Sequence, residues 1–351
     1  MSVTTLQDRL AAKGAVLGEY RGGETPMSFG NPAAELRALL EGCGLYDMNW
    51  QAKLVLTGED RVRWLNGMVT NNVRDLAVGN GVYSFLLTAQ GRIVADLVSY
   101  NRSDYLLVTS DRSQVHAIKE MFDHYIIMDD VEVADISDKL SAVGVAGPEA
   151  VTVLKKAGIE FQQLDPGQVI DLTWRGIGIS VARNTHPNMD GYGVWFAAEQ
   201  ADTVWDALTA AGATPIGSEA LEWYRISRGV PRYGIDLSQR DLPQETEQKH
   251  ALNFAKGCYI GQEIVERIRA RAILHRTFTG FLFEGEPPQS GTKIKEGDKN
   301  IGEITSVARI PFPSGEHTVA LGYLRREFEK PGTVVQVGVQ TATVQTIPFQ
   351  F

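Results

Sequence analysis

One eight-residue stretch concentrates the groups that could do chemistry. Residues 256–263 read KGCYIGQE and hold one of only two cysteines in the chain. A thiol reacts, or binds metal, as its thiolate, and a nearby ammonium group such as that of Lys256 favours this form. Gly257 and Gly261 permit positive φ and close backbone approach, which predicts a tight, exposed turn that presents Cys258. The amide and the carboxylate that follow could hydrogen-bond a ligand or a partner. The candidate motif residues are Lys256, Gly257, Cys258, Tyr259, Gly261, Gln262 and Glu263.

A structural interpretation of the same stretch stays open, because free cysteine is among the most buried residue types. For that reason we expect Cys43, in a Gly-Cys-Gly turn, to pack in the core. Two cysteines cannot form a disulfide framework, and neither lies in a CxxC pair. They are too few to bind an iron–sulfur cluster with four thiolates from one chain. The six histidines show no metal-binding spacing, so no metal site is predicted.

Composition narrows the function classes. The 351 residues suggest two or three domains, and a hydrophobic content of 43% is ordinary for a folded soluble protein. The net charge of −9 argues against a nucleic-acid partner. The N-terminus lacks an apolar stretch of signal-peptide length, and no apolar run approaches the roughly 18 residues of a membrane span. A cytoplasmic protein without membrane contact is the simplest expectation.

Local patterns predict the elements that position these groups. Asn31 can cap a helix that begins with Pro32 and ends at Gly42. Alternating apolar residues joined by Gln90-Gly91 predict a β-hairpin. Helices are expected at residues 5–13, 32–42, 149–156 and 199–211 and after Asp111, and strands at residues 53–57, 82–87, 92–100, 105–109, 131–136, 141–145, 169–173, 177–182 and 193–196. The order strand, helix, strands, helix occurs twice along the chain, which is a weak indication of an internal duplication of α+β units.

The chain changes character near its end. From residue 277 onward, short strand-like runs alternate with turn residues, which predicts an all-β barrel-like module. Just before it, Arg267, Arg269 and Arg271 alternate on what we expect to be a strand or extended stretch, which would make one face basic. That face is either a solvated surface paired with nearby glutamates or a docking surface for an acidic ligand tail or partner.

Three segments carry a resemblance to a known family. KGCYIGQE resembles the signature of the YgfZ-type folate-binding proteins, a branch of the superfamily that contains the glycine-cleavage T-protein, an aminomethyltransferase. Residues 220–234 resemble the superfamily's "R-(I/L)-E-x-G-x-P…YG" segment, and residues 44–100 resemble its "GLFDVS…LVTNDV…DDLIVY" segment.

This resemblance implies an α+β fold. Its expected form is two duplicated α/β sandwich-like domains with ferredoxin-like elements around a central channel, followed by the barrel. The implied domains are residues 1–130, a folate-channel domain; residues 131–275, which carry the cysteine motif; and residues 276–351, the barrel.

The resemblance also implies site residues for tetrahydrofolate: Arg225, Tyr83, Asp96 and Tyr100, with Asp96 and Cys258 as catalytic candidates. Arg225 in a salt bridge to Glu222, and Asp96 as a strand-face residue bonded to the backbone, are the structural alternatives. Two departures from the superfamily pattern matter. Its acidic pair is Ala95-Asp96 here, and Gly193 stands where a glutamate binds the pterin ring, so folate binding of the usual kind is in doubt because glycine offers no carboxylate.

The function implied is a tetrahydrofolate-binding accessory protein that supports assembly or repair of iron–sulfur enzymes. Its partners would be folate and iron–sulfur proteins or cluster-assembly factors, with Cys258 as the key thiol. The alternative is an aminomethyltransferase that transfers a one-carbon unit to tetrahydrofolate, so whether the protein is an enzyme stays open. A third possibility is a folate-independent binding or scaffold protein, which a channel blocked by a large side chain such as Trp195 would indicate.

Overall fold

The computed structural model describes residues 5–271 and 274–351, and the chain divides into two compact units. Unit 1 contains Met1–Gly67, Asn71–Ser84 and Leu97–Leu221, and unit 2 contains Met68–Thr70, Phe85–Asp96 and Glu222–Phe351. Unit 2 therefore includes Phe85–Asp96, the tip of the predicted hairpin, although the residues on either side of this segment belong to unit 1. The division of the sequence into three domains stays a prediction.

Unit 1 contains a six-stranded sheet in the order β10-β11-β12-β9-β3-β13. Its strand pairs are antiparallel except β13 with β3, which is parallel. The register places Gly193 opposite Gly144 and Trp195 opposite Ala142. The strands are β3 (Gly44–Asp47), β9 (Leu140–Ala146), β10 (Val169–Trp174), β11 (Ile177–Arg183), β12 (Gly191–Ala197) and β13 (Thr214–Pro215).

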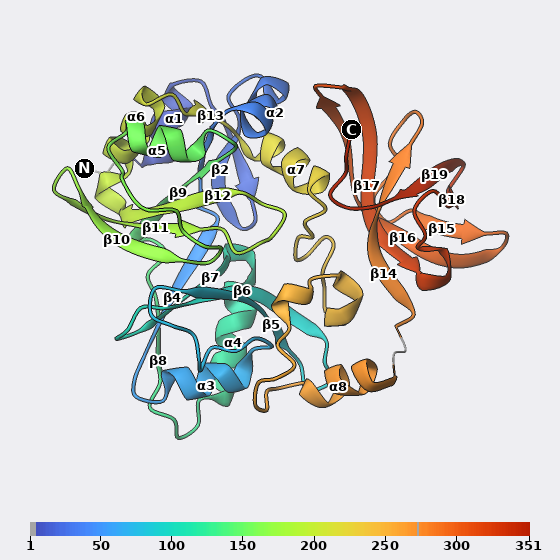
Figure 1. Cartoon of the computed structure of the whole chain (residues 1–351), viewed down its shortest axis with the longest axis horizontal. Helices are drawn as coiled ribbons and strands as arrows, with labels where there is room; N and C mark the ends of the chain where they lie inside the picture. Colours follow the sequence, from blue (N-terminus) through green and yellow to red (C-terminus); the bar gives the residue numbers. More distant parts are fainter. Residues whose placement is uncertain (1–4, 272–273) are drawn as a thin grey trace. The chain divides into compact units, whose positions relative to one another are not determined.

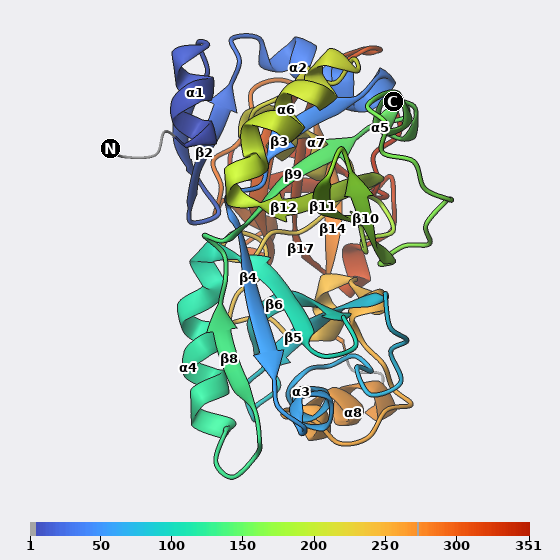
Figure 2. The same ribbon diagram turned by 90° about the vertical axis from the view of Figure 1, so that its left-hand side faces the viewer.

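A second sheet has the order β5-β6-β7-β4-β8, and β1 pairs with β2 in a separate hairpin. The tip of the β5–β6 hairpin belongs to unit 2, and the rest of this sheet belongs to unit 1. The strands are β1 (Val16–Tyr20), β2 (Gly23–Ser28), β4 (Gln51–Thr57), β5 (Gly81–Leu87), β6 (Ile93–Asn101), β7 (Leu106–Asp111) and β8 (Glu132–Asp135). Figure 2 shows β8 lying beside α4 (Val115–Tyr125).

Capping explains where the first helices start. The side chains of Thr5 and Asp8 form a capping box, and Asn31 accepts a hydrogen bond from the backbone N–H of Ala34 ahead of Pro32. Asp111 makes no capping bond to the helix predicted after it, because its carboxylate pairs with Arg21. The helices up to residue 227 are α1 (Leu6–Ala12), α2 (Pro32–Glu41), α3 (Arg61–Met68), α4, α5 (Ala150–Lys156), α6 (Ala201–Ala210) and α7 (Ser218–Ser227).

The C-terminal part of unit 2 is a closed six-stranded barrel, drawn in orange and red in Figure 1, with the order β14-β17-β16-β15-β18-β19. Phe281, Ile304, Leu324 and Val344 are fully buried in its core. Closure leaves no unpaired sheet edge. The strands are β14 (Arg276–Phe283), β15 (Lys293–Glu296), β16 (Lys299–Phe312), β17 (Gly315–Arg325), β18 (Val334–Val337) and β19 (Gln340–Gln345). The predicted α+β class with a C-terminal barrel is confirmed.

The strand predicted for the three alternating arginines is wrong. Arg267, Arg269 and Arg271 lie on helix α8 (Gln262–Arg271), where residues two apart point in nearly opposite directions. Arg269 pairs with Glu266 at 3.4 Å, three residues earlier on the helix. The arginines therefore form no single basic face. Within residues 5–271 and 274–351, no helix is long and apolar enough to cross a membrane.

Candidate functional site

The cysteine motif of unit 2 is a loop with one buried anchor and one exposed thiol. Cys258 is exposed, whereas Lys256 is only 6% exposed. The Lys256 ammonium donates to the carbonyl oxygen of Val69 at 2.6 Å and lies 5.0 Å from the centre of the Tyr259 ring. Lys256 therefore anchors the loop, and its predicted effect on the thiol stays a prediction.

Gly261 packs this loop against the turn of the β5–β6 hairpin. It has φ +81°, and a Cβ there would lie 2.6 Å from the carbonyl oxygen of Thr88. Gly91 faces it with φ +73°, and a Cβ on Gly91 would lie 2.9 Å from Cβ of Ile264. Gly257 has open space instead. Only the second glycine of the motif is thus required by packing.

The polar residues after Gly261 begin helix α8. The side-chain oxygen of Gln262 accepts a hydrogen bond from the backbone N–H of Tyr259 at 3.3 Å, which closes the loop on itself. Glu263 is exposed in the first turn of the helix, where a negative charge is favourable. Burial, with the charge of Glu266 adding, raises the pKa of Tyr259 to about 12.

The hairpin that receives this loop also carries Asp96. Successive side chains of a strand point to opposite faces. Ala95 and Leu97 are 0% and 1% exposed, and Asp96 between them is partly exposed. The acid that this chain lacks at position 95 would therefore face the packed core, and the acid that it keeps is on the open face.

Tyr233 is a residue that sequence reasoning did not select as a site residue. Burial raises the pKa of the Tyr233 hydroxyl, and the negative charges of Asp96 and Asp241 raise it further. The hydroxyl is thus a neutral donor within electrostatic reach of Asp96. Its signal in the sequence was the Tyr-Gly pair that follows the Arg225 segment.

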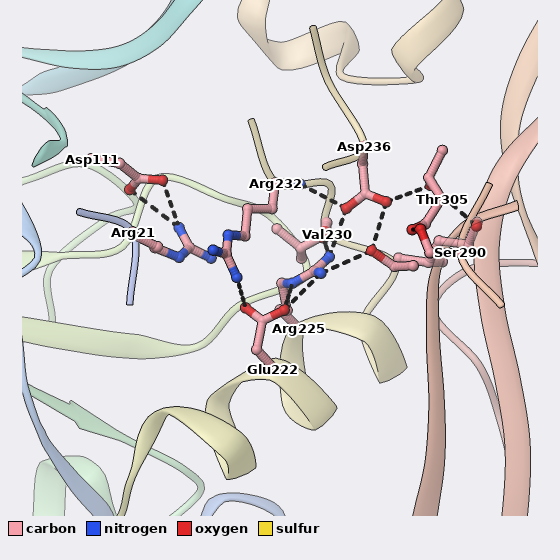
Figure 3. A network of polar contacts seen from close by, with 11 residues as sticks. Arg21, Asp111, Glu222, Arg225, Val230, Arg232, Asp236, Ser290 and Thr305 are labelled. Carbon is pink, nitrogen blue, oxygen red and sulfur yellow. Dashed lines mark hydrogen bonds and ion pairs between the residues drawn. The ribbon is translucent and has the colours of Figure 1, made fainter. Parts of the chain in front are cut away.

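Arg225 lies in a buried polar network, shown in Figure 3. The side chain is 3% exposed, and its guanidinium contacts Glu222 and Asp236 at 2.7 Å each. It also donates to the Val230 carbonyl at 3.2 Å and to the Ser306 hydroxyl at 2.9 Å. A guanidinium has five N–H donors, and these contacts use all five. This is the salt-bridged alternative for Arg225, and it leaves no donor for a folate.

The aromatic candidates of unit 1 are packed to different degrees. Tyr100 is 5% exposed, its ring meets that of Trp195 edge to face at 5.1 Å, and burial raises its pKa. Tyr83 is half-buried, and its carbonyl accepts a hydrogen bond from the Asn71 amide at 2.9 Å. Asp190 is exposed and pairs with Arg183 at 3.5 Å.

Two further predictions concern the thiol of Cys43 and a metal site. Cys43 is 4% exposed, as expected, and burial, with the charge of Glu149 adding, raises its pKa to about 12. Among the residues that the structure describes, no three His, Cys, Asp or Glu side chains are grouped so that they could hold a metal ion.

The fold and these segments define a class of protein. The family model described as "GCVT N-terminal domain" matches residues 6–256, and that described as "Glycine cleavage T-protein C-terminal barrel domain" matches residues 276–349. The chain belongs to this glycine-cleavage T-protein family. The YgfZ branch predicted from KGCYIGQE stays a prediction.

Named relatives are similar over nearly their whole length. Proteins named aminomethyltransferase from Streptomyces avermitilis and Cutibacterium acnes are 27% and 29% identical, over 91% and 96% of this chain and 88% and 95% of theirs. The crystal structure of the glycine cleavage system aminomethyltransferase T from Bartonella henselae has a TM-score of 0.88 at 20% identity. It covers 99% of this chain and 98% of that one, and it is similar in fold.

Proposed function

We propose that this protein transfers a one-carbon unit to tetrahydrofolate, as an aminomethyltransferase, with Asp96 as its acid–base group. The observation that carries the proposal is the orientation of strand β6: Asp96 is partly exposed, and Ala95 is fully buried. The loss of the acid at position 95 is one of the departures from the superfamily pattern that speak against transfer chemistry. A side chain directed into the core could not have reached a substrate, so that argument loses its force.

The family supports the same proposal. The relatives named aminomethyltransferase align over 91% and 96% of this chain. The missing pterin-binding glutamate at Gly193 still argues against the usual mode of folate binding. Arg225 is given no ligand contact here because its donors are committed within the protein.

The chemistry requires one proton-handling group. A carrier-bound aminomethyl group, S–CH2–NH2, would lose ammonia and the carrier thiol as its carbon forms bonds to two folate nitrogens. The two N–H protons of the folate leave with the ammonia and the thiol, so atoms balance. A carboxylate beside those nitrogens can accept one proton and return it to the leaving amine. We assign this role to Asp96, which is partly exposed and has the neutral Tyr233 hydroxyl within electrostatic reach.

The test combines binding with turnover. Tetrahydrofolate is titrated calorimetrically, and its conversion to the methylene form is followed with a carrier protein loaded with the aminomethyl group. Asp96→Asn is expected to bind tetrahydrofolate within about threefold of wild type and to lose at least about 100-fold in turnover. Asp298→Asn, at an exposed turn of the barrel, is the matched control and should change neither. A wild-type protein without turnover, or an Asp96→Asn variant with full turnover, contradicts the proposal.

A second candidate function is favoured by the exposed thiol. Cys258 stands on a loop that Lys256 and Gly261 hold in place, whereas Cys43 is buried. We propose it as the group of an accessory role in assembly or repair of iron–sulfur enzymes. If that role exists, Cys258→Ser slows reactivation of a damaged iron–sulfur enzyme and leaves tetrahydrofolate turnover intact. Cys43→Ser is the control, and equal reactivation by all three proteins would rule the role out.

A further inference from the structure

Trp195 occupies space that a side chain at Gly193 would need. The two residues are two apart on strand β12, so they share one face of the sheet. A Cβ on Gly193 would lie 3.3 Å from the indole Nε1 of Trp195, which is its nearest neighbour. The nitrogen edge of the indole thus lies over the bare backbone of Gly193.

The other neighbours of this edge are aromatic or polarizable. The Tyr100 ring meets the indole at 5.1 Å with an interplanar angle of 83°, and the same Cβ position is 3.9 Å from Sδ of Met48. All of these residues belong to unit 1. Such an environment suits a flat ring, since aromatic faces and thioether sulfur pack well against π-systems.

The indole N–H has no hydrogen-bond partner within residues 5–271 and 274–351, although Trp195 is only 2% exposed. Two other indoles of unit 1 are paired, whereas the N–H of Trp50, a residue that is only partly buried, also has no partner among the described residues. Trp174 donates to the Ala157 carbonyl at 2.9 Å and Trp64 to the Tyr125 carbonyl at 3.2 Å. Buried donors are nearly always paired, so an exception calls for an explanation. A donor reserved for a ligand is one.

We propose that Trp195, Tyr100 and Met48 form a ring-binding site in unit 1, and that Trp195 determines its specificity because its indole N–H donates to an oxygen acceptor of the bound ligand. The inference rests on the proposed function, which supplies tetrahydrofolate as the ligand. Gly193 allows the indole to shift, because no side chain stands against its nitrogen edge. The ring enters beside Tyr100 and Met48 as the indole moves, and the unpaired N–H gains its bond.

This arrangement reverses the hydrogen-bonding character of the site. A carboxylate at position 193 would accept N–H bonds from a ring, whereas the indole can only donate. The site should therefore select a ring with a carbonyl oxygen over one with an amino group at the same place. With an amino group at this place, the ligand and the indole are both donors, so the indole N–H stays unpaired. A site whose buried polar group would be left unpaired rejects the mismatched ligand strongly.

The experiment measures that selectivity. The intact protein is titrated calorimetrically with tetrahydrofolate and with its 4-amino analogue, in which an amino group replaces the ring carbonyl oxygen. Wild type is expected to bind the carbonyl form at least about tenfold more tightly. Trp195→Phe keeps a ring and removes the N–H, so the ratio should fall to within about twofold. Trp205→Phe, at another tryptophan of unit 1 that is 2% exposed, is the matched control and should keep the wild-type ratio.

The outcomes separate the inference from the function. Unchanged selectivity in Trp195→Phe overturns the inference and leaves the proposed function standing, whereas no binding of either ligand to wild type removes both. If Trp195→Phe does not fold, Gly193→Ala serves instead. Its Cβ would press on the indole at 3.3 Å, and it should lower the selectivity at least threefold. No change in that variant would also overturn the inference.

Discussion

The Arg225 network and the Cys258 loop lie in the same unit and treat their reactive groups in opposite ways. Around Arg225 the protein supplies a partner for every donor, and the Asp236 side chain is 0% exposed. Around Cys258 the protein anchors the loop through Lys256 and Gly261 and leaves the thiol exposed.

The contrast separates residues that hold the fold from residues that can meet a ligand. A guanidinium whose five N–H groups are all bonded can act on a ligand only by positioning others. An exposed side chain on an anchored loop can contact a ligand without any local unfolding. A family match at a single position therefore does not by itself assign a role, and the partners of that residue have to be known.

The largest expected effect is at the network. Arg225→Met should lower the free energy of unfolding by about 3–5 kcal/mol, because it leaves the buried carboxylate of Asp236 without its cation. Arg326→Met is the control; its side chain is 49% exposed and pairs with Glu329 at 3.4 Å, so the change should stay below about 1 kcal/mol. Urea denaturation measures both. A loss below 1 kcal/mol for Arg225→Met would mean that the Asp236 carboxylate is not buried from water or does not depend on Arg225.

The two glycines of the cysteine motif should differ by an intermediate amount. Gly261→Ala combines a positive φ with a Cβ only 2.6 Å from a carbonyl oxygen, so we expect a loss of about 1–3 kcal/mol in the free energy of unfolding. Gly257→Ala places its Cβ in open space and should change stability by less than about 0.5 kcal/mol. Equal effects in thermal or urea denaturation would disprove the bracing role of Gly261.

Removal of the exposed thiol should cost little. Cys258→Ser is expected to change the free energy of unfolding by less than about 0.5 kcal/mol, since the side chain is exposed. Urea denaturation of the variant beside wild type checks this. A loss above 1 kcal/mol would show that Cys258 is part of the packing of the loop and would weaken the case for a free thiol.

Thiol alkylation sharpens the comparison without any effect on stability. At pH 8 iodoacetamide should modify one thiol of the folded protein, Cys258, because Cys43 is buried and its pKa is raised to about 12. The raised pKa keeps Cys43 protonated at this pH, so it should react only after unfolding. Mass spectrometry of peptides gives the site. Modification of Cys43 in the native protein is the contrary result.

Local patterns carried much of the fold. The capped helix at Pro32, the β5–β6 hairpin and the barrel strands follow from capping residues, alternation and turn residues, all of which act within a few positions. The arginine repeat misled because alternating charges without alternating apolar residues carry no strand signal, and Glu266–Arg269 is a helical pair. The orientation of Asp96 could have been predicted from the sequence. Its neighbours Ala95 and Leu97 are both apolar and are expected to face the core, so Asp96 between them is expected to face the opposite side of the strand.

The sequence by itself determined the family, the class of fold and the motif that contains Cys258, because these depend on residue order. Only the tertiary structure decided what Arg225 and Trp195 can do. The partners of Arg225 include Asp236, 11 residues away, and Ser306, 81 residues away. Trp195 meets Tyr100 from another sheet and has no acceptor within the described part of the chain. Hydrogen-bond pairing depends on distances of a few ångströms between residues far apart in the chain, and residue order does not contain those distances.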